Sequence, residues 1–195
     1  MARDFVTVVS GLPRSGTSMM MRMLQAGGVP AVTDGERAAD PDNPHGYFEL
    51  EAVKRLPADV AWLDAAAGRA VKVVSVLLEK LPATSRYRVV FLERNMSEVL
   101  ASQRRMLERR GQATDRVADE AMASMFRRHV ATILERVRAR PEMSLLFLRY
   151  DEVVSKPREA AIAVDEFLGG GLDLDRMCAA VDASLYRQRA GTSAS

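Results

Sequence analysis

Short apolar runs alternate with longer amphipathic segments along the chain. The apolar runs are rich in β-branched and aliphatic residues, and they predict strands near residues 5–10, 70–75, 87–93 and 144–149. The longest amphipathic segment, residues 114–140, predicts a helix with one apolar face. Because the strands alternate with helices, we expect a parallel sheet with helices on both faces, which is a three-layer α/β/α domain.

Local signals mark several helix boundaries. Asn95 is expected to cap the helix after the third strand, with Glu98 as its reciprocal partner three residues later. A helical pattern over residues 49–67 is interrupted at Pro57, because proline has no N–H to donate. Asp173 is expected to open the last helix.

The composition is that of an ordinary globular domain. The 195 residues suit one domain over residues 1–189, followed by a frayed tail at 190–195. The net charge of +2 is too small to indicate a nucleic-acid partner, and no apolar run approaches the ~20 residues that span a membrane. The single cysteine, Cys178, excludes an internal disulfide and favours a reducing compartment. Since no signal-peptide pattern precedes the first strand, we expect a cytoplasmic protein.

Residues 11–18 read Gly-Leu-Pro-Arg-Ser-Gly-Thr-Ser and form a glycine-bounded turn between the first strand and the first helix. Such a turn directs backbone N–H groups and the positive end of the helix dipole towards a bound phosphate. The stretch departs from the nucleoside-triphosphatase loop, because Thr17 stands where that loop has lysine. Arg14 is the cation that can replace this lysine. A tight turn without a ligand is the simpler alternative.

This loop resembles the 5′-phosphosulfate loop of sulfotransferases, and in particular its Pro-Arg-Ser-Gly-Thr form in the tyrosylprotein group. The resemblance implies 3′-phosphoadenosine 5′-phosphosulfate (PAPS) as the donor and adenosine 3′,5′-bisphosphate as the product. No metal is expected, because a sulfuryl group carries less negative charge than the terminal phosphoryl group that magnesium neutralises. The resemblance assigns the 5′-phosphosulfate to the end of the loop, which consists of Arg14, Ser15, Gly16, Thr17 and Ser18.

Arg94 and Ser102 form a second motif after the third strand. Open parallel sheets place ligands at the carboxyl ends of their strands, where an arginine offers a fork of donors to a phosphate. Arg-Asn-x-x-x-Val-x-x-Ser resembles the 3′-phosphate motif of sulfotransferases, which has the same separation of eight positions. A helix cap is the alternative for this stretch alone. The two residues can share one phosphate only if the helix tilts back, since the serine lies about 10 Å along it.

The resemblance to sulfotransferases covers nearly the whole chain. Residues 149–169, which run from Arg-Tyr-Asp-Glu through a proline to Phe-Leu-Gly, are similar to a family segment with Arg-Tyr-Glu-Asp-Leu and Phe-Leu-Gly. A basic loop late in the family's chain helps to cover the nucleotide, and this implies a role for Arg187 and Arg189. The glycine-rich motif of that family loop is absent from this sequence.

The acidic, proline-containing segment 34–51 is the expected source of a general base. An acceptor hydroxyl must lose its proton as it attacks sulfur, which requires a carboxylate or a neutral imidazole. The resemblance implies Glu or His for this step, and the candidates are Glu36, His45 and Glu49. Glu36 lies one residue from the offset of the catalytic glutamate in the tyrosylprotein group, whereas Glu49 leads into a helix. A solvated acidic loop is the alternative, because the segment must return across the carboxyl edge of the sheet.

Two other side chains have open roles. Lys72, in the second strand, is either a cation of the site or a side chain that reaches solvent at the sheet edge. His129, among basic neighbours in the long helix, is expected to have a structural or surface role.

Together, the resemblances of the two phosphate motifs to sulfotransferases imply transfer of a sulfuryl group from PAPS to a hydroxyl or amine of a small-molecule or peptide acceptor. Arg14 is expected to stabilise the charge that grows on the leaving oxygen. One alternative is a P-loop kinase or nucleotidase that uses magnesium-ATP, with Glu93 or Asp151 supporting the metal. The other is a nucleotide-binding module without catalytic activity.

Overall fold

The computed structural model describes residues 3–37, 39–40, 43–44, 46–109, 111–112 and 119–186. Three of the predicted site residues, His45, Arg187 and Arg189, lie outside the described residues. The tail 190–195 and the first residues of the expected helix 114–140 lie outside them as well.

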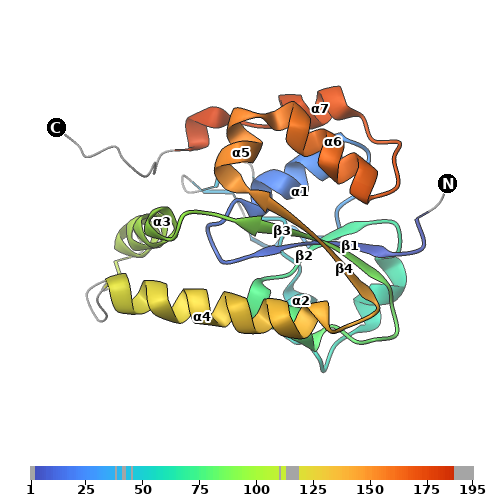
Figure 1. Ribbon diagram of the computed structural model, residues 1–195, viewed down its shortest axis with the longest axis horizontal. Coiled ribbons are helices and arrows are strands. Elements are labelled where there is room, and N and C mark those ends of the chain that lie inside the picture. The colour runs from blue at the N-terminus through green and yellow to red at the C-terminus, as the bar shows by residue number, and fades with distance from the viewer. Residues whose placement is uncertain are drawn as a thin grey trace.

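All four predicted strands are confirmed, and they form one parallel sheet (Figure 1). The order in the sheet is β2-β1-β3-β4, so the first strand lies in the middle. The second strand is shorter than the expected range 70–75, because the chain turns into the 3₁₀ helix η2 (Ser75–Lys80). The strand bounds are β1 Val6–Gly11, β2 Ala70–Lys72, β3 Tyr87–Glu93 and β4 Met143–Arg149.

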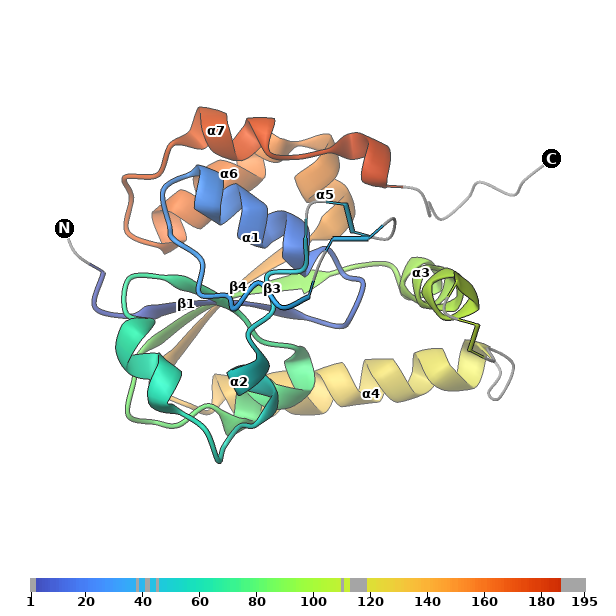
Figure 2. The same cartoon turned by 180° about the vertical axis from the view of Figure 1, so that it is seen from behind.

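Helices cover both faces of the sheet, which confirms the three-layer architecture (Figures 1 and 2). One face carries α1 (Thr17–Ala26), α5 (Tyr150–Ser155), α6 (Pro157–Phe167) and α7 (Leu174–Ala179). The other face carries α2 (Glu51–Lys54), α4 (Asp119–Arg138) and the 3₁₀ helices η1 (Ala61–Ala65) and η2. Helix α3 (Met96–Arg109) lies beyond the carboxyl ends of the strands, and η3 (Ala183–Leu185) follows α7.

Two apolar cores form because successive strand residues point to opposite faces. Val9 and Val90 pack with α1 and α6, whereas Val8, Val89 and Phe91 pack with α4 and η2. Since both faces are buried, the strands read as nearly continuous apolar runs. Within the described part of the chain, no helix is long and apolar enough to cross a membrane.

The helical pattern over residues 49–67 overestimates the regular structure there. Only the short α2 and η1 form, and turns join them. Pro57 stands between these pieces and cannot continue a helix, because it lacks an amide hydrogen and its ring clashes with the preceding turn. The expected start of the last helix is confirmed, since the Asp173 side chain accepts a hydrogen bond from the amide of Arg176.

The turn between β1 and α1 depends on a glycine at position 16. Gly16 has a φ of 98°, in the left-handed region that glycine adopts most readily. A Cβ atom built on Gly16 would overlap the ring of Tyr150, which follows β4. Gly16 therefore permits both the backbone conformation and the close approach of the aromatic ring.

Two glycine substitutions separate these two requirements. Gly28 has nearly the same φ, 100°, but apart from its chain neighbours no described residue has an atom within 4 Å of the position of its Cβ. We expect Gly28→Ala to lower the free energy of unfolding by about 1–2 kcal/mol, the cost of a left-handed alanine. Gly16→Ala should cost more, because the Tyr150 ring must also move. Urea unfolding of both variants measures the difference, and equal losses would contradict the proposed importance of the ring contact.

Candidate functional site

The loop between β1 and α1 presents its backbone to a cavity at the carboxyl edge of the sheet. Gly16 occupies the N-cap position of α1, and no side chain of the described residues caps this helix end. The N–H groups of the first turn therefore keep their donor capacity for a ligand. Ser15 is buried, and its Oγ has no hydrogen-bond partner among the described residues. Both features are typical of an anion site.

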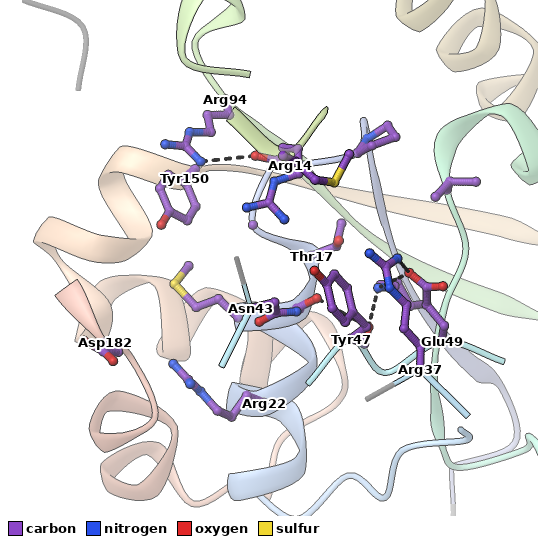
Figure 3. Close-up of a pocket in the computed structure, with 17 residues that line it drawn as sticks. Arg14, Thr17, Arg22, Arg37, Asn43, Tyr47, Glu49, Arg94, Tyr150 and Asp182 are labelled. Carbon is purple, nitrogen blue, oxygen red and sulfur yellow. Dashed lines mark hydrogen bonds and ion pairs between the residues drawn. The ribbon is translucent and has the colours of Figure 1, made fainter. Parts of the chain in front are cut away.

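The cavity has a volume of about 230 Å³ and is lined by residues that follow each strand (Figure 3). Arg14 follows β1, Lys72 ends β2, Arg94 follows β3 and Tyr150 follows β4. The carboxyl ends of parallel strands meet at one edge of a sheet, which is where such folds place their ligands. Thr17 and Ser18 also line this cavity.

Arg94 is held in the cavity wall by contacts on several sides. Its Nε donates to the carboxylate of Glu98 at 2.9 Å, and its Nη1 donates to the backbone carbonyl of Arg14 at 3.2 Å. The guanidinium also lies over the ring of Tyr150, 4.4 Å from the centroid. Because the Arg94 and Glu98 side chains are only 8% and 4% exposed, solvent screens this ion pair weakly.

Asn95 and Glu98 both form side-chain hydrogen bonds near the start of α3. Asn95 accepts a hydrogen bond from the amide of Ser97, as expected of a residue that precedes a helix. The Glu98 carboxylate, expected to complete a capping box, binds Arg94 and the hydroxyl of Tyr186. A carboxylate at this position satisfies the local pattern, and it also bonds Arg94, four residues earlier, and Tyr186, 88 positions later.

Ser102 meets the loop through the side chain of Arg14. The Nε of Arg14 donates to Ser102 Oγ at 2.9 Å, and Ser102 is buried. Arg94 and Ser102 therefore contact the same residue, one at its carbonyl and the other at its guanidinium. The backbone of Arg14 has a φ of 73°, which is uncommon for a residue other than glycine.

The acidic segment does return across the sheet edge. The Thr33 hydroxyl donates to the carbonyl of Glu49 at 2.8 Å, which joins the two ends of the segment. Between them, the buried Tyr47 offers its carbonyl to the amine of Lys72 and to the hydroxyl of Ser18. These bonds attach the segment to the end of β2 and to the start of α1.

The candidate bases lie in different surroundings. Glu49 lines the cavity, and its carboxylate is 2.6 Å from Arg37, 3.5 Å from Lys72 and 3.6 Å from Lys54. Glu36 is exposed and does not belong to the cavity wall, and its amide donates to the carboxylate of Asp34 at 3.1 Å. His129 hydrogen-bonds Ser75 at 3.1 Å and is also not part of this wall.

Several wall residues were not predicted. Arg37 lies over the Tyr47 ring, 3.3 Å from its centroid, and the Tyr47 hydroxyl is 2.7 Å from Asp40. Figure 3 shows Arg22 and Asp182 on the other side of Thr17 from Glu49. No sequence motif indicated these residues. The position of Lys72 in a strand was the one available signal, and its two possible roles could not be separated.

Lys72, like Arg94, is a buried cation of the wall. The residue is 9% exposed, and burial lowers the pKa of its amine to about 8, although Glu49 acts in the opposite direction. The cluster of Lys72, Glu49 and Arg37 thus holds positive charge close to the phosphate loop.

The lowered pKa of Lys72 predicts how stability changes with pH. The unfolded chain keeps this amine protonated up to its ordinary pKa of 10.5, whereas the folded protein releases the proton near 8. The unfolded state binds more protons between these two values, so the free energy of unfolding rises with pH. Between pH 8 and 10.5, the free energy of unfolding of the wild type should rise by about 3 kcal/mol relative to that of Lys72→Met. Urea unfolding of both proteins across the range tests this, and a difference that does not change with pH would contradict it.

Solved structures of sulfotransferases share the fold. The sulfotransferase domain of the Synechococcus PCC 7002 olefin synthase has a TM-score of 0.59 and 18% identity, and the alignment covers 99% of this chain and 90% of that domain. A mouse sulfotransferase in complex with PAP has a TM-score of 0.57 and 16% identity, over 97% of this chain and 69% of that one. A sulfotransferase from Mycobacterium tuberculosis has a TM-score of 0.56 and 16% identity, over 92% of this chain and 71% of that one.

The sequence itself matches the model of the sulfotransferase domain. The match covers residues 5–189, from the start of β1 through the C-terminal segment. A comparison with curated protein sequences finds no match. Because the family match covers far more than half of the chain, the chain belongs to the sulfotransferase family of transferase enzymes.

Proposed function

We propose that this sulfotransferase uses PAPS as its donor and acts on a hydroxyl or amine of a small-molecule or peptide acceptor. The observation that carries the proposal is the convergence of two phosphate motifs on Arg14. Arg94 donates to the carbonyl of Arg14, and Ser102 accepts from its side chain. A nucleotide with groups at both its 5′ and 3′ positions matches two motifs that meet at one residue.

Features of the loop support an anionic donor. The N-terminus of α1 has no side-chain cap, and the buried hydroxyl of Ser15 has no partner among the described residues. The cavity wall adds the positive charge of Arg14 and Lys72. The mouse relative was crystallised with PAP, which supports a nucleotide of this class.

We assign the following roles to residues of the cavity. The donor supplies the sulfuryl group, whose bond to the 5′-phosphate oxygen breaks as the acceptor atom bonds to sulfur. The backbone of residues 14–18 orients the 5′ end through its N–H groups. Arg14 neutralises charge on the leaving oxygen, and Lys72 adds a second cation at the same end of the cavity.

We infer that Glu49 is the general base in preference to Glu36. Glu49 lines the cavity, and its contacts with Arg37 and Lys72 fix the direction of its carboxylate. Glu36 is exposed on the same segment. In this assignment, the acceptor proton moves to a Glu49 oxygen as the new bond to sulfur forms.

The proposed donor predicts a difference between two nucleotides in thermal stability. Adenosine 3′,5′-bisphosphate should stabilise the protein without magnesium, by about 2.7 kcal/mol at a hundred times its dissociation constant. Magnesium-ATP should stabilise it much less, because Thr17 replaces the lysine of the triphosphatase loop. Differential scanning fluorimetry with and without EDTA measures both effects.

The alternatives give other results in the same experiment. Stabilisation by ATP that disappears on chelation would favour a kinase or nucleotidase over the proposed function. Stabilisation by the bisphosphate without turnover of PAPS on any acceptor in a broad panel would indicate a binding module without catalytic activity.

The assignment of the base predicts unequal effects of two substitutions. With an acceptor identified, Glu49→Gln should lower the rate of sulfuryl transfer by about 10²–10⁴-fold, because the amide cannot take the proton. Glu36→Gln, which removes a carboxylate from the same segment, serves as the matched control and should retain activity. Bisphosphate affinity, measured by calorimetry, should stay within about twofold for both variants. The reverse pattern would assign the base to Glu36.

A further inference from the structure

Glu98 connects two parts of the chain that lie 88 positions apart. Its carboxylate accepts from Arg94 Nε at 2.9 Å through one oxygen and from the Tyr186 hydroxyl at 2.8 Å through the other. The Glu98 side chain is only 4% exposed, so both bonds form away from solvent. A charged acceptor makes each of them stronger than a bond between neutral groups.

Aromatic contacts reinforce this connection. The rings of Tyr150 and Tyr186 meet edge to face, with centroids 5.1 Å apart and an interplanar angle of 88°. The guanidinium of Arg94 lies 4.4 Å from the first ring centroid and 5.3 Å from the second. Figure 3 shows Arg94 and Tyr150 side by side, with the bond from Arg94 to the carbonyl of Arg14.

The arrangement fixes the plane of the Arg94 guanidinium. Glu98 holds its Nε, the Arg14 carbonyl holds its Nη1, and the two tyrosine rings lie next to it. Burial and the bond to Glu98 raise the pKa of Tyr186 to about 12, so its hydroxyl remains a donor at neutral pH. A planar guanidinium binds an anion well only when its fork of donors is oriented.

We propose that Glu98 and Tyr186 are positioning residues. They couple residues 183–186, here called the C-terminal segment, to recognition of the nucleotide 3′-phosphate. Glu98 orients Arg94, and Tyr186 ties the segment that ends the described chain to the same carboxylate. Binding of a 3′-phosphate at Arg94 and docking of the C-terminal segment therefore favour each other. This inference rests on the proposed function, because it requires a donor with a 3′-phosphate.

Tyr186→Phe tests the coupling and leaves the Arg94–Glu98 pair in place. Calorimetry compares adenosine 3′,5′-bisphosphate with adenosine 5′-phosphate, which lacks the 3′ group. We expect the variant to bind the bisphosphate about 3–10-fold more weakly, which is less than the full loss of a hydrogen bond to a charged group because Tyr186 acts on the nucleotide only through Glu98 and Arg94. Its affinity for adenosine 5′-phosphate should stay within about twofold of the wild type, because the 5′ loop is unchanged.

Tyr87→Phe is the matched control. The Tyr87 hydroxyl donates to the carbonyl of Pro82, also at 2.8 Å. Tyr87 is the first residue of β3, so it lies at the amino ends of the strands, away from the cavity at their carboxyl ends. Each variant loses a hydrogen bond of its tyrosine hydroxyl, so both should lose some thermal stability. Only Tyr186→Phe should change the ratio of the two nucleotide affinities, which a purely structural role would not do.

A second variant tests Glu98 directly. Glu98→Gln removes the carboxylate charge and one of its two acceptor oxygens, so the charged bonds to Arg94 and Tyr186 are replaced by weaker bonds to a neutral amide. It should also weaken bisphosphate binding selectively, by about tenfold.

The outcomes separate this inference from the proposed function. A wild type that binds both nucleotides equally would overturn the proposed 3′-phosphate site and the coupling with it. A wild type that prefers the bisphosphate, with the same preference in Tyr186→Phe, would overturn the coupling alone. Equal weakening for both nucleotides would show that Tyr186 acts on the fold as a whole, which also overturns it.

Discussion

The position of Arg14 depends on contacts from two directions, and the cavity depends on that position. Its backbone is in a left-handed conformation, its carbonyl accepts from Arg94, and its guanidinium donates to Ser102. The loop after β1 and the loop after β3 are thereby locked together at the carboxyl edge of the sheet. Tyr150, which follows β4, packs against Gly16 in the same turn. Three neighbouring strands therefore define one rigid anion site.

The acidic segment 34–51 forms another part of the cavity wall, where its groups pair with the positive charge of Lys72. Lys72 is buried at the end of β2, and the carbonyl of Tyr47 and the carboxylate of Glu49 lie next to its amine. The desolvation of one amine is thus partly offset by a segment without regular structure. This segment serves as a wall because its polar groups face those of the strand end.

Features that depend on neighbouring residues were predicted from the sequence, whereas features that depend on residues far apart in the sequence were not. The four strands and the glycine-bounded turn were predicted because apolar runs and Gly16 act locally. The interruption at Pro57 was predicted correctly, but the helical pattern over residues 49–67 overestimates the regular structure on both sides of it, where only the short α2 and η1 form. The orientation of Glu98 was also missed, since its partner Tyr186 is 88 positions away. For the same reason, pairing of Lys72 with Glu49 left no local signal in the sequence.

The charge of the wall has a kinetic consequence. Of the described residues that line the cavity, five are cations and two are carboxylates, while the whole chain has a net charge of only +2. The cations are Arg14, Arg22, Arg37, Lys72 and Arg94. Such a concentration of positive charge in a concave surface focuses the electric field and raises the encounter rate of anions. The rate of capture of an anionic ligand therefore falls with ionic strength, even though the molecule as a whole is nearly neutral.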